Sequence, residues 1–335
     1  MTLSRMRSAT VRVVRRPHTV DRGVNTDPGG GSIQPLIRPF SGTRMTSDLG
    51  IAILMKNEAM VKSMICEGVD VNHTDSLGCD PGIQSKALQT PLHICAIHNV
   101  PSIADLLLRK RYPMLDSADA RGCTALHHAA YLGHVEVAES LLKAGINMAA
   151  VDKLGRTAMH SVACGGSIKM LAVLREAGAK ITVRDFRGRT VAHYAAVASQ
   201  TAFLSAILKI DKELLNVTDD DGYTPLHYAV QSGQNSKTIE LLVENGCDVL
   251  AAANDGTTAL HIAATLAESA IPIEYLVKCK GIDLNARNVD GMTPLHLASE
   301  WSKVSRVDAL IKVYESLFSA FLLTKSPRDY FGKGV

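Results

Sequence analysis

The chain of 335 residues lacks any apolar run long enough to cross a membrane. The longest purely apolar run near its C-terminus is Ala320–Leu323, whereas a membrane-spanning helix needs about 20 such residues. The N-terminal region also lacks the apolar segment of a secretory signal. The sequence therefore predicts neither a membrane span nor secretion.

The sequence also lacks a cysteine framework. Its seven cysteines are an odd number, are scattered along the chain and include no Cys-x-x-Cys pair. Disulfide-rich secreted domains and common zinc motifs carry regularly spaced cysteines instead. The pattern is typical of a reduced intracellular protein, and we expect a cytoplasmic or nuclear location.

Catalytic and ligand-binding motifs are missing as well. There is no Gly-rich phosphate loop, no Gly-x-Ser-x-Gly and no helix with paired histidines. The acidic triplet Asp219–Asp221 lacks the alternating oxygens and closing Glu of a calcium loop, so we interpret it as a solvated turn. The histidines outside the repeated phrase described next (His18, His73, His98, His128 and His134) show no ligand spacing. We expect no enzyme activity, no cofactor and no metal site.

One short phrase, Thr-x-x-His, recurs seven times at intervals of 33 to 35 residues. Its copies begin at Thr90, Thr124, Thr157, Thr190, Thr224, Thr258 and Thr293. A fixed period in this range indicates a stack of similar units that share one continuous apolar interior. The seven repeated histidines lie about one unit apart, which is too far for them to meet at one ion.

The phrase, its period and its surroundings resemble the ankyrin repeat. The best copy, residues 119–145, matches the family pattern almost throughout. The threonine is a natural N-cap, and three copies have proline at the first helical position, where no N–H is needed. The resemblance implies an all-α solenoid of helix–turn–helix units joined by β-hairpin-like fingers. It also implies that each repeated histidine hydrogen-bonds backbone near the neighbouring finger.

Three regions are predicted. Residues 1–46 carry eight Arg, no Lys and two Asp, together with prolines and the run Gly29–Ser32, and we expect a disordered basic tail. A mitochondrial transit peptide is an alternative, because residues 1–20 are acid-free and Arg-rich. A nucleic-acid-binding arm is a weaker one, because no aromatic is interleaved with the arginines. Residues 47–325 form about eight units, and residues 326–335 are a disordered end.

Several units depart from the pattern. The first, Ser47–Asn72, lacks the phrase and is polar, as an end cap should be. Cys79–Leu88 is an inserted loop before the second unit. The fifth unit lacks both of its terminating glycines, so its helix ends must shift. The last outer helix is predicted to extend to Leu323 and to cap the stack or offer an apolar surface.

The family resemblance places partner contacts on the fingers and inner helices of the concave side. We predict that partner-binding positions include Arg121, Tyr131, Lys153, Arg156, Phe186, Arg187, Arg189, Asp220, Asp221, Tyr223, Asp255, Asp290 and Trp301. Their charge runs from basic in the third to fifth units to acidic in the sixth to eighth. Such a gradient either arises from chance scatter or orients a partner. The aromatic members are candidate anchors, although Trp301 could equally pack under the C-terminal helix.

These features favour a scaffold or adaptor that binds another protein. The alternatives are an inhibitor-type regulator that masks a basic segment of a transcription factor, or the cytoplasmic repeat domain of an ankyrin-type channel. The channel would require membrane spans beyond Val335. Asn72 and Asn285 resemble the finger asparagines that an asparaginyl hydroxylase modifies in ankyrin repeats.

Overall fold

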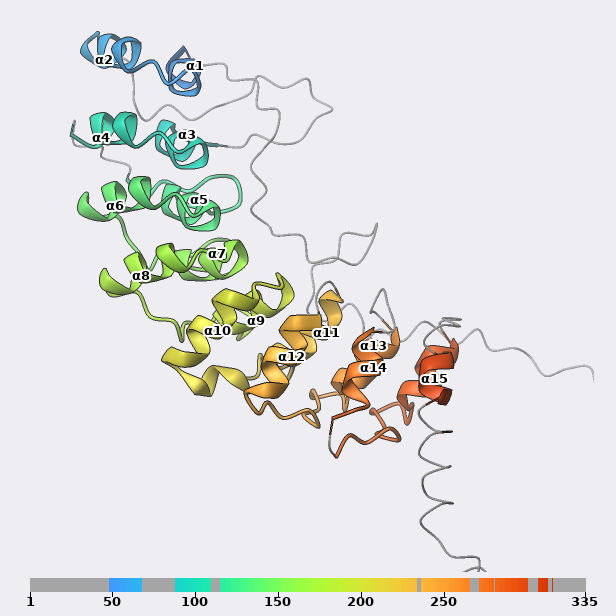
Figure 1. Ribbon diagram of the computed structural model, residues 1–335. Coiled ribbons are helices and arrows are strands. Elements are labelled where there is room, and N and C mark those ends of the chain that lie inside the picture. The colour runs from blue at the N-terminus through green and yellow to red at the C-terminus, as the bar shows by residue number, and fades with distance from the viewer. Residues whose placement is uncertain are drawn as a thin grey trace, which may run out of the picture.

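The computed structural model shows a curved stack of helix pairs (Figure 1). It describes residues 48–67, 88–109, 115–233, 236–265, 271–279, 281–300, 307–312 and 315. No strand occurs among these residues, apart from an isolated bridge between Ala252 and Thr258. The predicted all-α solenoid is confirmed.

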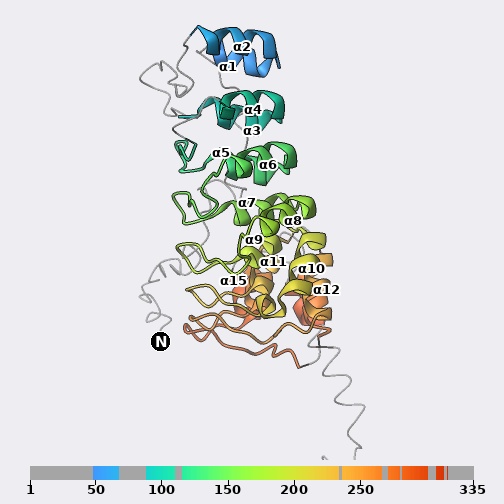
Figure 2. The same cartoon turned by 90° about the vertical axis from the view of Figure 1, so that its left-hand side faces the viewer.

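Each of the first seven units supplies one inner and one outer helix, and the eighth supplies an inner helix among the described residues. The inner helices are α1 (Asp48–Leu54), α3 (Pro91–His98), α5 (Ala125–Leu132), α7 (Ala158–Gly165), α9 (Val191–Val197), α11 (Pro225–Ser232), α13 (Ala259–Thr265) and α15 (Pro294–Glu300). The outer helices are α2 (Glu58–Cys66), α4 (Pro101–Arg109), α6 (Val135–Lys143), α8 (Ile168–Glu176), α10 (Thr201–Ile210), α12 (Ser236–Glu244) and α14 (Ile271–Leu276). The finger loops project together from one side of the stack (Figure 2).

The repeated phrase starts each inner helix through a reciprocal cap. In the second unit, Nδ1 of His93 accepts from the Thr90 backbone N–H at 3.1 Å and lies 2.8 Å from its hydroxyl. The ring proton of the neutral histidine therefore sits on Nε2, which donates to the carbonyl of Cys123 in the next unit at 2.9 Å. Equivalent bonds to the next unit are made by His127, His160, His193 and His261. The role expected for the repeated histidines is thus observed at these five, whereas Nε2 of His227 has no hydrogen-bond partner among the described residues.

The interior is one continuous layer instead of a separate core for each unit. Alanines such as Ala129, Ala163 and Ala195 are fully buried and let neighbouring inner helices approach closely. Larger residues such as Leu141 and Leu174 fill the space beneath the outer helices. No unit can bury these faces alone, which is why the stack folds as an array.

Where glycine is missing, other residues adopt its conformation. Helix α5 ends at Gly133 with φ of 74°, whereas α3 ends at Asn99 with φ of 51°. In the fifth unit, Ser199 takes the left-handed conformation, and a 3-10 helix, η1 (Lys212–Leu215), follows α10. The expected shift of helix ends is therefore found there.

Some predictions fall outside the described residues. These are the tail at residues 1–46, all of the inserted loop except Leu88, the C-terminal end, Asn72 and Trp301. The first unit is present as α1 and α2, which bury Leu49, Ile53 and Val61 against the stack. No helix within the described ranges is both long and apolar enough to traverse a bilayer.

Candidate functional site

The finger tips are joined into a ladder by backbone hydrogen bonds. The N–H of Lys153 donates to the carbonyl of Arg121 at 3.1 Å. The same bond recurs from Phe186 to Leu154, from Asp220 to Arg187, from Asn254 to Asp221 and from Val289 to Asp255, at 2.8 to 3.0 Å. Residues far apart in sequence therefore form one row along the finger side of the molecule (Figure 2).

A buried aspartate holds each of four turns in shape. In the third unit, Oδ1 of Asp119 accepts from the N–H groups of Arg121 and Cys123 at 2.8 and 2.9 Å. Asp152, Asp185 and Asp219 make the same pair of bonds in the next three units. Each aspartate therefore holds the backbone of its own turn in one shape.

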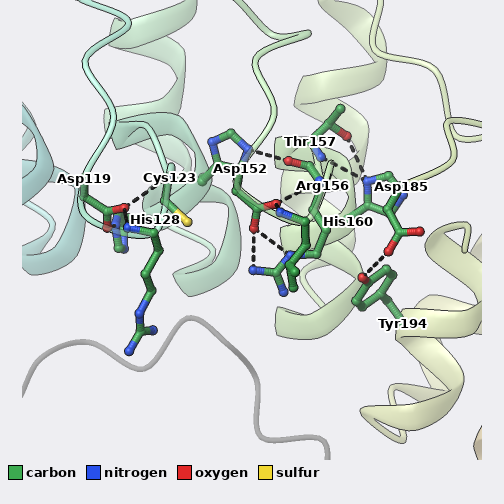
Figure 3. Close-up of polar contacts among 12 residues, drawn as sticks. Asp119, Cys123, His128, Asp152, Arg156, Thr157, His160, Asp185 and Tyr194 are labelled. Atoms are coloured by element: carbon green, nitrogen blue, oxygen red, sulfur yellow. Dashed lines mark hydrogen bonds and ion pairs between the residues drawn. The ribbon is translucent and has the colours of Figure 1, made fainter. Parts of the chain in front are cut away.

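The second carboxylate oxygen bonds to histidine, arginine or tyrosine, depending on the unit, and Figure 3 shows the third to fifth units. Oδ2 of Asp119 accepts from His128 at 2.9 Å, and Oδ2 of Asp152 pairs with the guanidinium of Arg156 at 2.5 Å. In the fifth unit, Oδ2 of Asp185 pairs with Arg189 at 2.8 Å and accepts from Tyr194 at 2.6 Å. In the sixth, Asp219 accepts from Tyr228 at 2.7 Å.

Two arginines that were predicted to lie on the surface are buried. Arg156 and Arg189 are only 3% and 7% exposed, because their guanidinium groups turn inward to neutralise a buried aspartate. The prediction that they present charge to a partner is wrong.

The pKa values of the aspartates follow from these partners. Burial alone would raise the pKa of Asp185, but the Arg189 guanidinium, the Tyr194 hydroxyl and the backbone N–H bonds together outweigh burial and hold that pKa below its ordinary value. Asp219 forms no ion pair within the described part of the chain, and burial raises its pKa. The guanidinium of Arg189 therefore stabilises the ionised form of its aspartate, a contribution that Asp219 lacks.

The charge gradient persists after the correction. Lys153 and Arg187 are exposed and Arg121 is half-buried, all on basic fingers. Asp220 and Asp290 are exposed, and Asp221 and Asp255 are half-buried, on acidic fingers. The ladder bond from Asp220 to Arg187 marks the point where the sign changes.

The apolar anchors differ in exposure. Phe186 is 69% exposed, and its ring lies over Gly155, where an added Cβ would come within 2.5 Å of it. Tyr131 at the end of α5 is half-buried, as is Tyr223, whose ring packs edge-on against His227 and Tyr228. Val289, which the family pattern places at the position equivalent to Phe186, is 68% exposed.

The structure also shows the predicted modification site Asn285 and most of the cysteines. Asn285 is exposed, and its N–H donates to Oδ1 of Asp283 at 2.9 Å in a turn. The described cysteines are Cys66, Cys95, Cys123, Cys164, Cys247 and Cys279, and all are free thiols.

One group of side chains among the described residues could hold a metal ion. It consists of Asp119, Cys123 and His128, and all three are buried.

Comparison of the sequence with known protein families identifies the repeats. A family model described as ankyrin repeats (3 copies) matches residues 49–152, 159–253 and 249–317, which is more than half of the chain. No curated protein matches the chain. Ankyrin repeats are generally protein–protein interaction modules, and such domains are typically non-catalytic.

Proposed function

Because the chain belongs to the ankyrin-repeat family, we propose that it is an intracellular scaffold or adaptor that binds another protein along its row of fingers. The observation that carries this proposal is the ladder of backbone bonds from Arg121 to Val289. It supports a long, preformed surface whose charge changes sign once.

The surface suits a partner of opposite polarity. The acidic part of the partner would face Lys153 and Arg187, and the basic part of the partner would face Asp220 and Asp290. Complementary charge of this kind steers association and fixes direction more than it adds affinity. Affinity is then expected from apolar anchors, of which Phe186 is the most exposed.

A kinetic comparison tests the proposal. The partner is first identified by affinity capture on the full chain, and rate constants are then measured at two salt concentrations. Lys153→Glu with Arg187→Glu should slow association and weaken its salt dependence. The control is Lys169→Glu with Lys180→Glu, since these lysines are exposed but lie outside the finger row. Equal effects of the two pairs would show that the fingers are not the interface.

A second candidate rests on the acidic fingers alone. Asp220, Asp221, Asp255 and Asp290 would suit a basic segment, as in an inhibitor that masks a transcription factor. In that case Asp220→Asn with Asp290→Asn should abolish binding, while the Lys153 and Arg187 reversals should leave it intact. The adaptor proposal expects both pairs to matter.

The free thiols support a reducing compartment, and we propose the cytoplasm or nucleus. The mitochondrial alternative depends on residues 1–46. Fusing these residues to a fluorescent protein tests it, because a transit peptide would carry the fusion into mitochondria, whereas a diffuse signal would eliminate this alternative.

A further inference from the structure

Three buried side chains that can each ligate a metal meet beneath the finger of the third unit. Asp119 and Cys123 lie on either side of the turn, and His128 lies on α5. They are 4%, 0% and 2% exposed, and one ligand atom from each lies within 4.8 Å of the other two. Carboxylate, thiol and imidazole are all zinc ligands.

The neighbouring units show what this cluster replaces (Figure 3). The position of Cys123 is occupied by Arg156 in the fourth unit and by Arg189 in the fifth. There a guanidinium pairs with the buried aspartate at 2.5 and 2.8 Å. In the third unit this position carries the thiol of Cys123 and no guanidinium. The buried carboxylate of Asp119 therefore lacks the permanent cation that its two counterparts have.

His128 only partly fills this gap. One ring nitrogen, Nε2, lies 2.9 Å from Oδ2 of Asp119. The other, Nδ1, is buried and has no hydrogen-bond partner among the described residues. Nδ1 therefore makes no competing bond and can take the ring proton when Nε2 binds a metal.

We propose that Asp119, Cys123 and His128 bind a zinc ion, which supplies the positive charge that Arg156 and Arg189 provide in the next two units. Zinc bonds of 2.0–2.3 Å place tetrahedral ligands roughly 3.4 Å apart, so small side-chain rotations close the site. The thiol proton leaves to solvent, the ring proton of His128 moves from Nε2 to Nδ1, and Nε2 donates its lone pair to the ion. A water molecule completes the coordination.

The ion would tie the finger to α5. Asp119 already holds the backbone of Arg121 and Cys123 through Oδ1. Coordination through its other oxygen leaves those bonds in place. Zinc would therefore stiffen the basic end of the finger row without occupying it, which is a role separate from partner binding.

Cobalt is the probe, because a thiolate bound to Co²⁺ gives a charge-transfer absorption band that zinc lacks. The full chain is stripped with a chelator, titrated with Co²⁺ and then competed with Zn²⁺. The two test variants copy the neighbouring units. His128→Tyr introduces the residue found at Tyr194 and Tyr228, and Cys123→Arg introduces the residue found at Arg156. Cys247→Ser, which removes a buried thiol elsewhere, is the control.

The proposal expects the intact chain to develop the band at one ion per chain and to lose it to zinc. Both test variants should stay folded by circular dichroism and bind cobalt more than about 100-fold more weakly, since losing a ligand costs more than losing an outer-shell partner. Cys247→Ser should match the intact chain. The absence of a saturable band in the intact chain, its survival in either test variant, or its loss in Cys247→Ser would each overturn the proposal.

Discussion

Replacing Arg156 by alanine should destabilise the array far more than replacing Lys153, although the two basic residues lie three positions apart on one finger. Arg156 is 3% exposed, and its Nε donates to Oδ2 of Asp152 at 2.7 Å, in addition to the ion pair. Without it, the buried carboxylate of Asp152 loses those contacts.

Breaking a buried ion pair by removing one partner costs about 3–5 kcal/mol in the free energy of unfolding, because the remaining charge is uncompensated. Lys153→Ala removes a solvated side chain, and such changes usually fall within about 0.5 kcal/mol. Adding Asp152→Asn to Arg156→Ala should recover part of the loss, since the amide carries no charge.

Urea unfolding followed by circular dichroism measures these differences. The slope of the transition needs to be compared as well, because a repeat array can unfold in parts. If Arg156→Ala and Lys153→Ala changed stability by similar amounts, the assignment of Arg156 to the interior would be refuted.

The remaining predictions concern protonation and thiol access. Burial lowers the pKa of His93, His160, His193 and His227 to about 4. Below pH 6.5 these histidines therefore take up protons in the unfolded chain but stay neutral in the folded array. The free energy of unfolding falls as the pH decreases towards 4, and by pH 5.5 each histidine has lowered it by about 1.4 kcal/mol. A urea midpoint that stays flat between pH 7.5 and 5.5 would contradict this. Alkylation of the native chain, mapped by mass spectrometry, should label exposed Cys66 and spare Cys95 and Cys123, because burial encloses both thiols and raises their pKa values. Labelling of all three at equal rates would show that the interior is open.

The sequence predicted the stacked helices well because each phrase carries its own cap. Thr90 and His93 satisfy one another locally, so the helix start does not depend on distant residues. The positions of Phe186 and Arg187 were also predicted correctly as exposed, since the finger pattern fixes which residues lie at the tip.

The inward turn of Arg156 was not predicted, because the family pattern places this position among the partner contacts and the aspartate four residues earlier was not taken into account. An aspartate stands four residues before Arg156 and again before Arg189, and this spacing was the available signal. His128 was judged by spacing along the chain, which showed no ligand pattern. The turn of the finger brings Asp119 and Cys123 back beside it, a contact that linear spacing does not reveal.

The central claim is that partners bind along the finger row, and site-specific photocrosslinking tests it most directly. A photoreactive amino acid is placed in the full chain at Phe186 or, as a control, at Ile168, which is 48% exposed on the outer helix α8. We predict that the partner crosslinks at Phe186 and not at Ile168, and that the crosslink is lost when Lys153 and Arg187 are changed to Glu. Crosslinking at Ile168 with none at Phe186 would contradict the account.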